Sequence, residues 1–323
     1  LWDDQSGQTG YYDQVGRTGD NGTNKSFNAT VDAITTHVYN LYLMTGEQKY
    51  LDRLLDLQDN ILDYMVGNMD AQAIGFPEHF DTSWDIDEGQ RGSLMGHVLK
   101  TGWCLARIYR LQPDQEAISG AEKLVKYGLE NGGYDYQYGG PYKDFDRITG
   151  QMQMYGAIDT AKAWWQMEQA ITGGLLLWEI TGKDEYIQMA DESLDFFMNE
   201  FVDPVYGEVY ADRARDGGRV YYPGGYWDEN KAGLWKSAYH SIETGYYGYL
   251  YGKLLVKWEP ATLYYYFETV EARSVRMNPL AIDFDRLKIA SVMLNGEPYS
   301  DFDENSRILN IHPAQAGLFA VTY

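Results

Sequence analysis

The stretch "WEITGKDEYIQMADESL", residues 178–194, joins the end of an apolar run to an amphipathic run through a Thr-Gly turn. Two similar stretches come earlier, "LMTGEQKYLDRLLDL" at 43–57 and "YRLQPDQEAISGAEKL" at 109–124. A fixed period with a turn between two amphipathic runs is typical of a helical repeat. The turns lie 68 positions apart in both steps, at Thr45, Pro113 and Thr181.

Each repeat predicts an apolar helix, a short turn with acidic residues suited to starting a helix, and a more amphipathic helix. Helices that are apolar all round need a covering layer, so the pattern predicts an α/α toroid with inner and outer helices. About three and a half pairs are present, which is an incomplete ring. The inner helices are predicted at 28–44, 90–110 and 158–180, the outer ones at 47–66, 114–130 and 183–201, and a seventh helix at about 231–254.

The pattern changes after residue 258. Short β-branched and aromatic runs follow, such as "LKIASVMLNGEPY", and Asn295-Gly296 is a strong hairpin signal. We therefore predict a partial toroid over 1–258 and a small antiparallel β module over 259–323.

The composition of the chain argues against some classes of binding partner. The net charge of −22 argues against nucleic acid and anionic membranes, both of which select basic surfaces. No apolar run approaches the roughly 18–20 residues that span a bilayer. The single cysteine, Cys104, lies among apolar neighbours and is predicted to be structural. Zinc, EF-hand and phosphate-loop motifs are missing, so we predict no metal and no cofactor. The compartment cannot be read from the N-terminus.

The long loops all follow outer helices and should emerge on one face. The chain has 29 tyrosines and 9 tryptophans, and many of them lie in these loops among glycines and aspartates. Aromatic faces stack on sugar rings, and carboxylates bind hydroxyls, so a cleft for a mono- or oligosaccharide is expected. His79 and Trp84 lie on one such loop. Glu78 and Glu168 are two of several carboxylates that could contribute to a pair of the kind used in glycoside hydrolysis.

Residues 1–255 resemble the second half of the N-acylglucosamine 2-epimerase superfamily, which includes cellobiose 2-epimerases and aldose–ketose isomerases. The block from Trp164 to Tyr210 is the most specific match. The matching segments are "TGYYDQV", "KSFN", "GHVLKTGW", "KAWWQMEQAITG", "ITGKDEYIQMADESLDFFMNEFVDPVYGEVY" and "LWKSAYHSIETG".

The resemblance implies an (α/α)6 barrel that moves the C2 proton of a reducing-end sugar with two histidines. His97 matches the first histidine and His240 the second, while Trp164 and Trp165 match a tryptophan pair that floors the sugar site. The chain departs from the family pattern at several positions. The glutamate after the first histidine is Lys100, a further histidine aligns near Thr30 or Asp32, the Gln and Glu after the tryptophans align with Met167 and Gln169, and the asparagine after the second histidine is Ser241.

Two imidazoles suit proton transfer beside a carbonyl, because one can act as base while the other acts as acid near neutral pH. Lys100 lies one turn from His97. It either supplies positive charge to an enolate and the histidines or pairs with a carboxylate. The predicted catalytic residues are therefore His97, His240 and Lys100. The predicted substrate-binding residues are Trp164, Trp165, His79, Trp84, Glu168, Tyr239 and Trp235.

The predicted activity is that of a sugar 2-epimerase or aldose–ketose isomerase. A polysaccharide lyase or glycoside hydrolase of the same toroid class is the first alternative, and a non-catalytic sugar-binding subunit is the second. The repeat count leaves about 170 residues of a six-pair ring unaccounted for. We therefore expect an upstream segment, or a second polypeptide against 1–60 and 230–255, to complete the ring. The resemblance implies a cytoplasmic location, with the periplasm or secretion as alternatives.

Overall fold

The computed structural model describes residues 1–323 except 70–73, 87–88, 155–156, 222–229 and 280–286. The described chain divides into two compact units. Unit 1 contains Leu1–Thr36 and Asp52–Gly245, and unit 2 contains His37–Leu51 and Tyr246–Tyr323. The domain boundary expected near residue 258 stays a prediction. Each helix in the described ranges is too short or too polar to cross a membrane.

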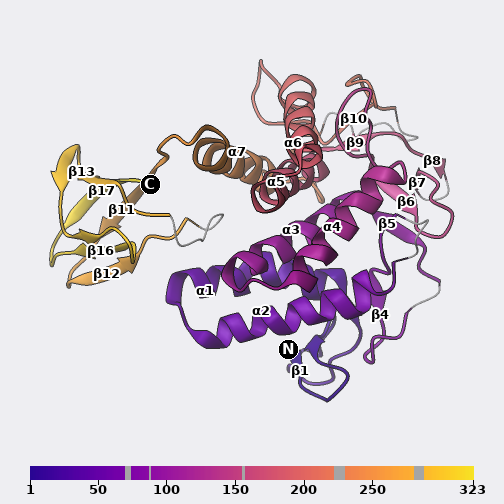
Figure 1. Ribbon diagram of the computed structural model, residues 1–323, viewed down its shortest axis with the longest axis horizontal. Helices are drawn as coiled ribbons and strands as arrows, with labels where there is room; N and C mark the ends of the chain where they lie inside the picture. Colours follow the sequence, from indigo (N-terminus) through magenta and orange to yellow (C-terminus); the bar gives the residue numbers. More distant parts are fainter. Residues whose placement is uncertain (70–73, 87–88, 155–156, 222–229, 280–286) are drawn as a thin grey trace. The chain divides into compact units, whose positions relative to one another are not determined.

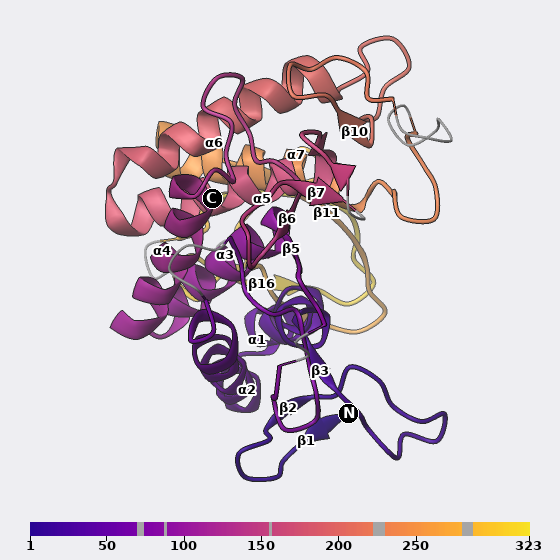
Figure 2. The ribbon, with the colours of Figure 1, turned by 90° about the vertical axis from the view of Figure 1, so that its right-hand side faces the viewer.

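Four helices form the centre of unit 1: α3 (Met95–Leu111), α4 (Gln115–Glu130), α5 (Trp164–Thr181) and α6 (Asp184–Phe196). α3 and α5 pack against each other, and each also packs on the helix that follows it in the chain (Figures 1 and 2). α3 and α5 are buried over most of their length, whereas α4 and α6 each keep a polar face. This layering confirms the predicted α/α toroid-type pairs.

The turns within the pairs follow the sequence signals. Asp114 caps α4, because its carboxylate accepts a hydrogen bond from the backbone N–H of Glu116. Gly182 ends α5 in the left-handed conformation at φ 69°, where a residue with a Cβ would be strained. α6 continues as the π-helix η4, Phe197–Phe201.

The remaining helical segments are less regular. The segment expected at 28–44 consists of η1 (Asn28–Asp32), η2 (Ile34–Val38) and α1 (Tyr39–Thr45). The segment expected at 47–66 consists of α2 (Gln48–Asn60) and η3 (Ile61–Val66). The seventh helix is α7 (Tyr239–Tyr251), followed by η5 (Gly252–Lys257).

Three helix starts were predicted too early: 90 instead of 95, 158 instead of 164, and 231 instead of 239. Before α3 and α5, the preceding residues are extended and pair with a later loop, so they are not free to be helical. β5 (Gly92–Leu94) pairs with β6 (Asp144–Asp146), and β9 (Lys162–Ala163) pairs with β10 (Asp212–Arg213). β3 (Lys25–Ser26) pairs with β4 (His79–Phe80) in the same way before η1. Unit 1 also holds β1 (Trp2–Asp3), β2 (Gly10–Tyr11), β7 (Gln153–Met154) and β8 (Ala157–Ile158).

Unit 2 contains the predicted antiparallel sheets, which lie in the order β11-β17-β13-β14 and β12-β16-β15. Asn295 and Gly296 both have positive φ and join β13 to β14, which confirms the hairpin. Alternate residues of β17, Phe319 and Val321, are buried in the sheet core. The strands are β11 (Thr262–Glu268), β12 (Arg273–Arg276), β13 (Ser291–Leu294), β14 (Glu297–Tyr299), β15 (Phe302–Asp303), β16 (Ile308–Ile311) and β17 (Ala316–Thr322).

Candidate active site

α3 and α5 each leave one residue partly exposed near their first turn. In α3, every residue from Met95 to Ile108 is buried except His97. In α5, every residue from Trp164 to Leu177 is buried except Trp165. The two rings contact each other, with 5.2 Å between their centroids. The inner helices therefore present an imidazole and an indole side by side at the same end.

His97 is held by two neighbours. Its Nδ1 lies 3.0 Å from Glu78 Oε2, and its ring stacks on Phe27 with centroids 3.8 Å apart. The other oxygen of Glu78 accepts the backbone N–H of Leu94, the residue that precedes α3. A carboxylate anchored in this way accepts the Nδ1–H of His97, which leaves Nε2 with a free lone pair.

Gly96 allows α3 to approach α5 closely. A Cβ at this position would lie 2.4 Å from Trp165 and 2.7 Å from Gln166. The amide oxygen of Gln166 also accepts the backbone N–H of Gly96 at 3.0 Å. This close approach sets Trp165 beside His97.

His240 is the second residue of α7 and is held by carboxylates. Its Nδ1 lies 2.6 Å from Oε2 of Glu168, a fully buried residue of α5. Glu243, one turn further along α7, lies 3.7 Å from the same nitrogen. Each histidine thus has a glutamate at Nδ1.

Trp165 links the two histidines, because its ring centroid lies 6.0 Å from that of His240 as well as near His97. Tyr239 packs edge-on against His240 at 4.9 Å and is about half exposed. Trp164 lies 6.3 Å from His240, and its indole N–H has no acceptor within the described residues. Four residues predicted to bind substrate, Trp164, Trp165, Tyr239 and Glu168, therefore each contact at least one of the two histidines.

Lys100 forms an ion pair with Asp32 of η1, with 2.7 Å between Nζ and Oδ1. Burial opposes its charge, but the Asp32 carboxylate outweighs burial and raises the pKa of Lys100. The sequence left two roles for Lys100 open, and the structure shows the one in which Lys100 pairs with a carboxylate. The ammonium still acts on the site, since its charge is felt at both Glu168 and His240.

Burial shifts the pKa values of Glu168 and His240, the second of the two histidine–glutamate pairs. It raises the pKa of Glu168 to about 7, against the opposing charges of Lys100 and Arg107. It also lowers the pKa of His240 to about 4, and the charge of Lys100 acts in the same direction. Both shifts favour the uncharged form of each group, and two groups this close titrate as a coupled pair. We name Glu168 and His240 the buried proton pair.

Glu168, His240 and Glu243 each place one possible metal-ligand atom within 4.8 Å of the others. However, the 2.6 Å between His240 Nδ1 and Glu168 Oε2 is a hydrogen-bond distance. Two atoms bound to one tetrahedral zinc ion would lie about 3.3 Å apart. The arrangement fits a shared proton better than a shared cation.

Three predicted substrate-binding residues lie differently. Trp84 is only 3% exposed, stacks on Tyr64 and donates its N–H to a backbone carbonyl, so its ring packs within unit 1. Trp235 is 72% exposed in the loop before α7. His79 lies in β4, one residue from Glu78. No ring contact with His97 or His240 is found for these three within the described residues.

The sequence model of the family described as N-acylglucosamine 2-epimerase (GlcNAc 2-epimerase) matches residues 18–232, about two thirds of the chain. The chain belongs to this family. The matched range includes the site residues described above except four that follow it in the chain: Trp235, Tyr239, His240 and Glu243.

A curated relative is similar to part of the chain. The cellobiose 2-epimerase of Bacteroides fragilis is 25% identical over 146 residues, which is 45% of this chain and 34% of that protein. The chain therefore spans about a third of the curated relative that it matches.

Two solved structures share the fold. A D-mannose isomerase has a TM-score of 0.62 at 19% sequence identity, and the match covers 76% of this chain and 61% of the isomerase chain. The cellobiose 2-epimerase of Bacillus thermoamylovorans B4167 has a TM-score of 0.56 at 17% identity, covering 75% and 56%. These structures support the (α/α)6-toroid class for the helical part.

Sequence reasoning missed Phe27 and Glu243 and did not connect Glu78 with His97. One available signal was the period itself. Asp32, Lys100 and Glu168 lie 68 positions apart in both steps, as His97 and Trp165 do. Equivalent positions on successive inner helices of a repeat face the same centre, so this spacing predicts the charged layer one turn below the rings.

Proposed function

We propose that the protein is a sugar 2-epimerase or aldose–ketose isomerase in which His97 and His240 move a proton next to the sugar carbonyl. The observation that carries the proposal is the paired geometry around Trp165. Each imidazole is held at Nδ1 by a glutamate and lies against the same indole. Both Nε2 atoms are thus left to act on a substrate.

In this proposal His97 acts as the base in one direction. Its Nε2 takes the proton from C2 of the open-chain sugar, and the C–H electron pair moves into an enediolate with the carbonyl oxygen. The buried proton pair then returns a proton from His240 Nε2. Protonation of C2 restores the aldehyde and gives the epimer, whereas protonation of C1 gives the ketose when the O2 hydroxyl proton moves to O1 and the C2 carbonyl forms. General acid–base catalysis of this kind contributes roughly 10²–10⁴-fold.

The enediolate needs a positive or hydrogen-bonding partner. We assign Lys100 a charge-supplying role, acting through its field while it stays bonded to Asp32. The unpaired indole N–H of Trp164 is a candidate donor to a sugar hydroxyl. Glu78 and Glu168, named above among the carboxylates that could serve hydrolysis, each contact a histidine.

The test is product analysis by NMR after incubation of the intact protein with mannose, glucose, fructose and cellobiose. We expect one of these sugars, or a related reducing sugar in a wider panel, to be converted to its 2-epimer or ketose. Hydrolysis of a glycosidic bond, or an unsaturated uronate product, would contradict the proposal.

A further inference from the structure

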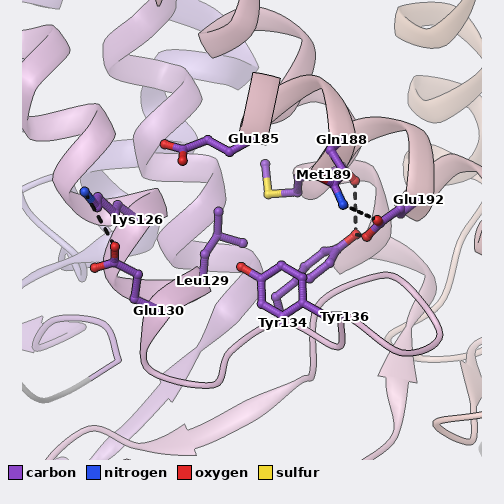
Figure 3. Close-up of a pocket in the computed structure, with 9 residues that line it drawn as sticks. All are labelled: Lys126, Leu129, Glu130, Tyr134, Tyr136, Glu185, Gln188, Met189 and Glu192. Carbon is purple, nitrogen blue, oxygen red and sulfur yellow. Dashed lines mark hydrogen bonds and ion pairs between the residues drawn. The ribbon is translucent and has the colours of Figure 1, made fainter. Parts of the chain in front are cut away.

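A small cavity lies between the outer helices α4 and α6, on elements that do not carry the histidines (Figure 3). Its volume is about 210 Å³. Buried apolar side chains close its inner end: Leu129, Met189 and the ring of Tyr134. The hydroxyl of Tyr134 donates to a carboxylate oxygen of Glu192 at 3.2 Å, which fixes the ring.

The rim of this cavity is aromatic and acidic. Tyr136 is 64% exposed and packs edge-on against Tyr134 at 5.1 Å. Three carboxylates surround the opening, from Glu130, Glu185 and Glu192. Burial raises the pKa of Tyr136, and all three carboxylates add to that shift, so the potential at the ring is negative.

The cavity has few cations to balance these charges. Lys126 is the cation in its lining and pairs with Glu130 at 3.5 Å. Gln188 donates to Glu192 at 2.7 Å. The carboxylate of Glu185, in contrast, is exposed to solvent and has no hydrogen bond or ion pair with another residue that the structure describes. The rim thus keeps a solvated carboxylate, without a partner among the described residues, near an exposed aromatic ring.

We propose that this cavity binds a small aliphatic amine in its ammonium form. The alkyl stem would lie on Leu129 and Met189, and the ammonium would lie between Glu185 and the ring of Tyr136. Aromatic rings attract cations, and carboxylates strengthen that attraction. The volume is below the roughly 300–1,000 Å³ of sites for drug-sized ligands, which favours a small amine over an oligosaccharide.

The test uses n-butylammonium as the probe and 1-butanol as its neutral counterpart, in an NMR titration of the Met189 methyl group in the intact protein. We expect saturable binding of n-butylammonium with a Kd on the order of 1–10 mM, and binding of 1-butanol at least tenfold weaker. Comparable binding of the two probes would overturn the proposal. So would the absence of saturation by about 50 mM butylammonium.

Variants separate the site from general charge effects. Glu185→Gln and Tyr136→Ala should each weaken butylammonium binding about threefold or more. The matched controls Glu297→Gln and Tyr264→Ala, on exposed strand positions of unit 2, should leave the Kd unchanged. Equal weakening by the controls would show a non-specific charge effect and overturn the site. Sugar conversion should be unaffected by all four variants, so this test is independent of the proposed activity.

Discussion

Lys100 of α3 and Asp32 of η1 form an ion pair with 2.7 Å between Nζ and Oδ1, and they lie one 68-residue period apart. The resemblance described above places a glutamate at the position of Lys100 and a histidine near Thr30 or Asp32. The layer below the two histidines thus holds a matched pair of opposite charges.

Asp32→Asn should destabilise the fold, because it leaves the buried ammonium of Lys100 without a carboxylate. We expect the free energy of unfolding, measured with urea, to fall by about 2–4 kcal/mol. Adding Lys100→Gln should recover part of the loss, since no unpaired charge then remains. Lys49→Gln removes an exposed ion pair and should cost less than about 1 kcal/mol. An Asp32→Asn protein as stable as the parent would contradict the structural role of the pair.

The pH dependence should report the buried proton pair. In the proposed mechanism, the protonated form of the buried proton pair holds the proton that His240 returns. Because the pKa of Glu168 is raised to about 7, this form is present below about pH 7 and is lost above it. We expect kcat/KM for sugar conversion to fall above pH 7 with a slope of −1. Glu168→Gln should lower kcat about 10²–10⁴-fold and abolish this limb. Glu116→Gln, an exposed position of α4, should keep it. A limb near pH 7 that survives Glu168→Gln would exclude this assignment.

Gly96→Ala tests the approach of α3 to α5. Its Cβ would lie 2.4 Å from Trp165, so the indole between the histidines must move. We expect a loss of about 1–3 kcal/mol in stability and at least tenfold in kcat. Gly173→Ala is the matched control, because its Cβ would meet nothing closer than 3.6 Å. Since alanine favours helix, this control should be as stable as the parent or more so. Equal effects of the two substitutions would argue against a specific role for Gly96.

Glu78→Gln tests the positioning of His97. The amide keeps the size of the side chain but is a weaker acceptor for Nδ1–H and permits the other tautomer. We expect kcat to fall about 10–10³-fold with KM changed less than about threefold, since Glu78 acts through His97. Measuring both constants on one converted sugar checks this. A change in KM alone would instead place Glu78 in substrate binding.

The sequence predicted the helix pairs, their turns and the terminal hairpin because each has a local cause, such as the apolar period, Gly182 or Asn295-Gly296. The helix starts were missed where β5 and β9 form, because pairing with a distant loop leaves no periodic signal. Both histidines follow from the family motifs. The partnership of His97 with Glu78 and Phe27 was not predictable, because these two residues come from separate segments, 19 and 70 positions before His97.

Solvent-deuterium incorporation tests the central claim most directly. A sugar that the intact protein converts in D₂O should acquire deuterium at C2, or at C1 of a ketose product. His97→Asn and His240→Asn should each reduce incorporation at least 10²-fold, while His312→Asn, in unit 2, should not. Conversion that leaves these carbons undeuterated, or undiminished incorporation in both active-site variants, would contradict proton transfer by His97 and His240.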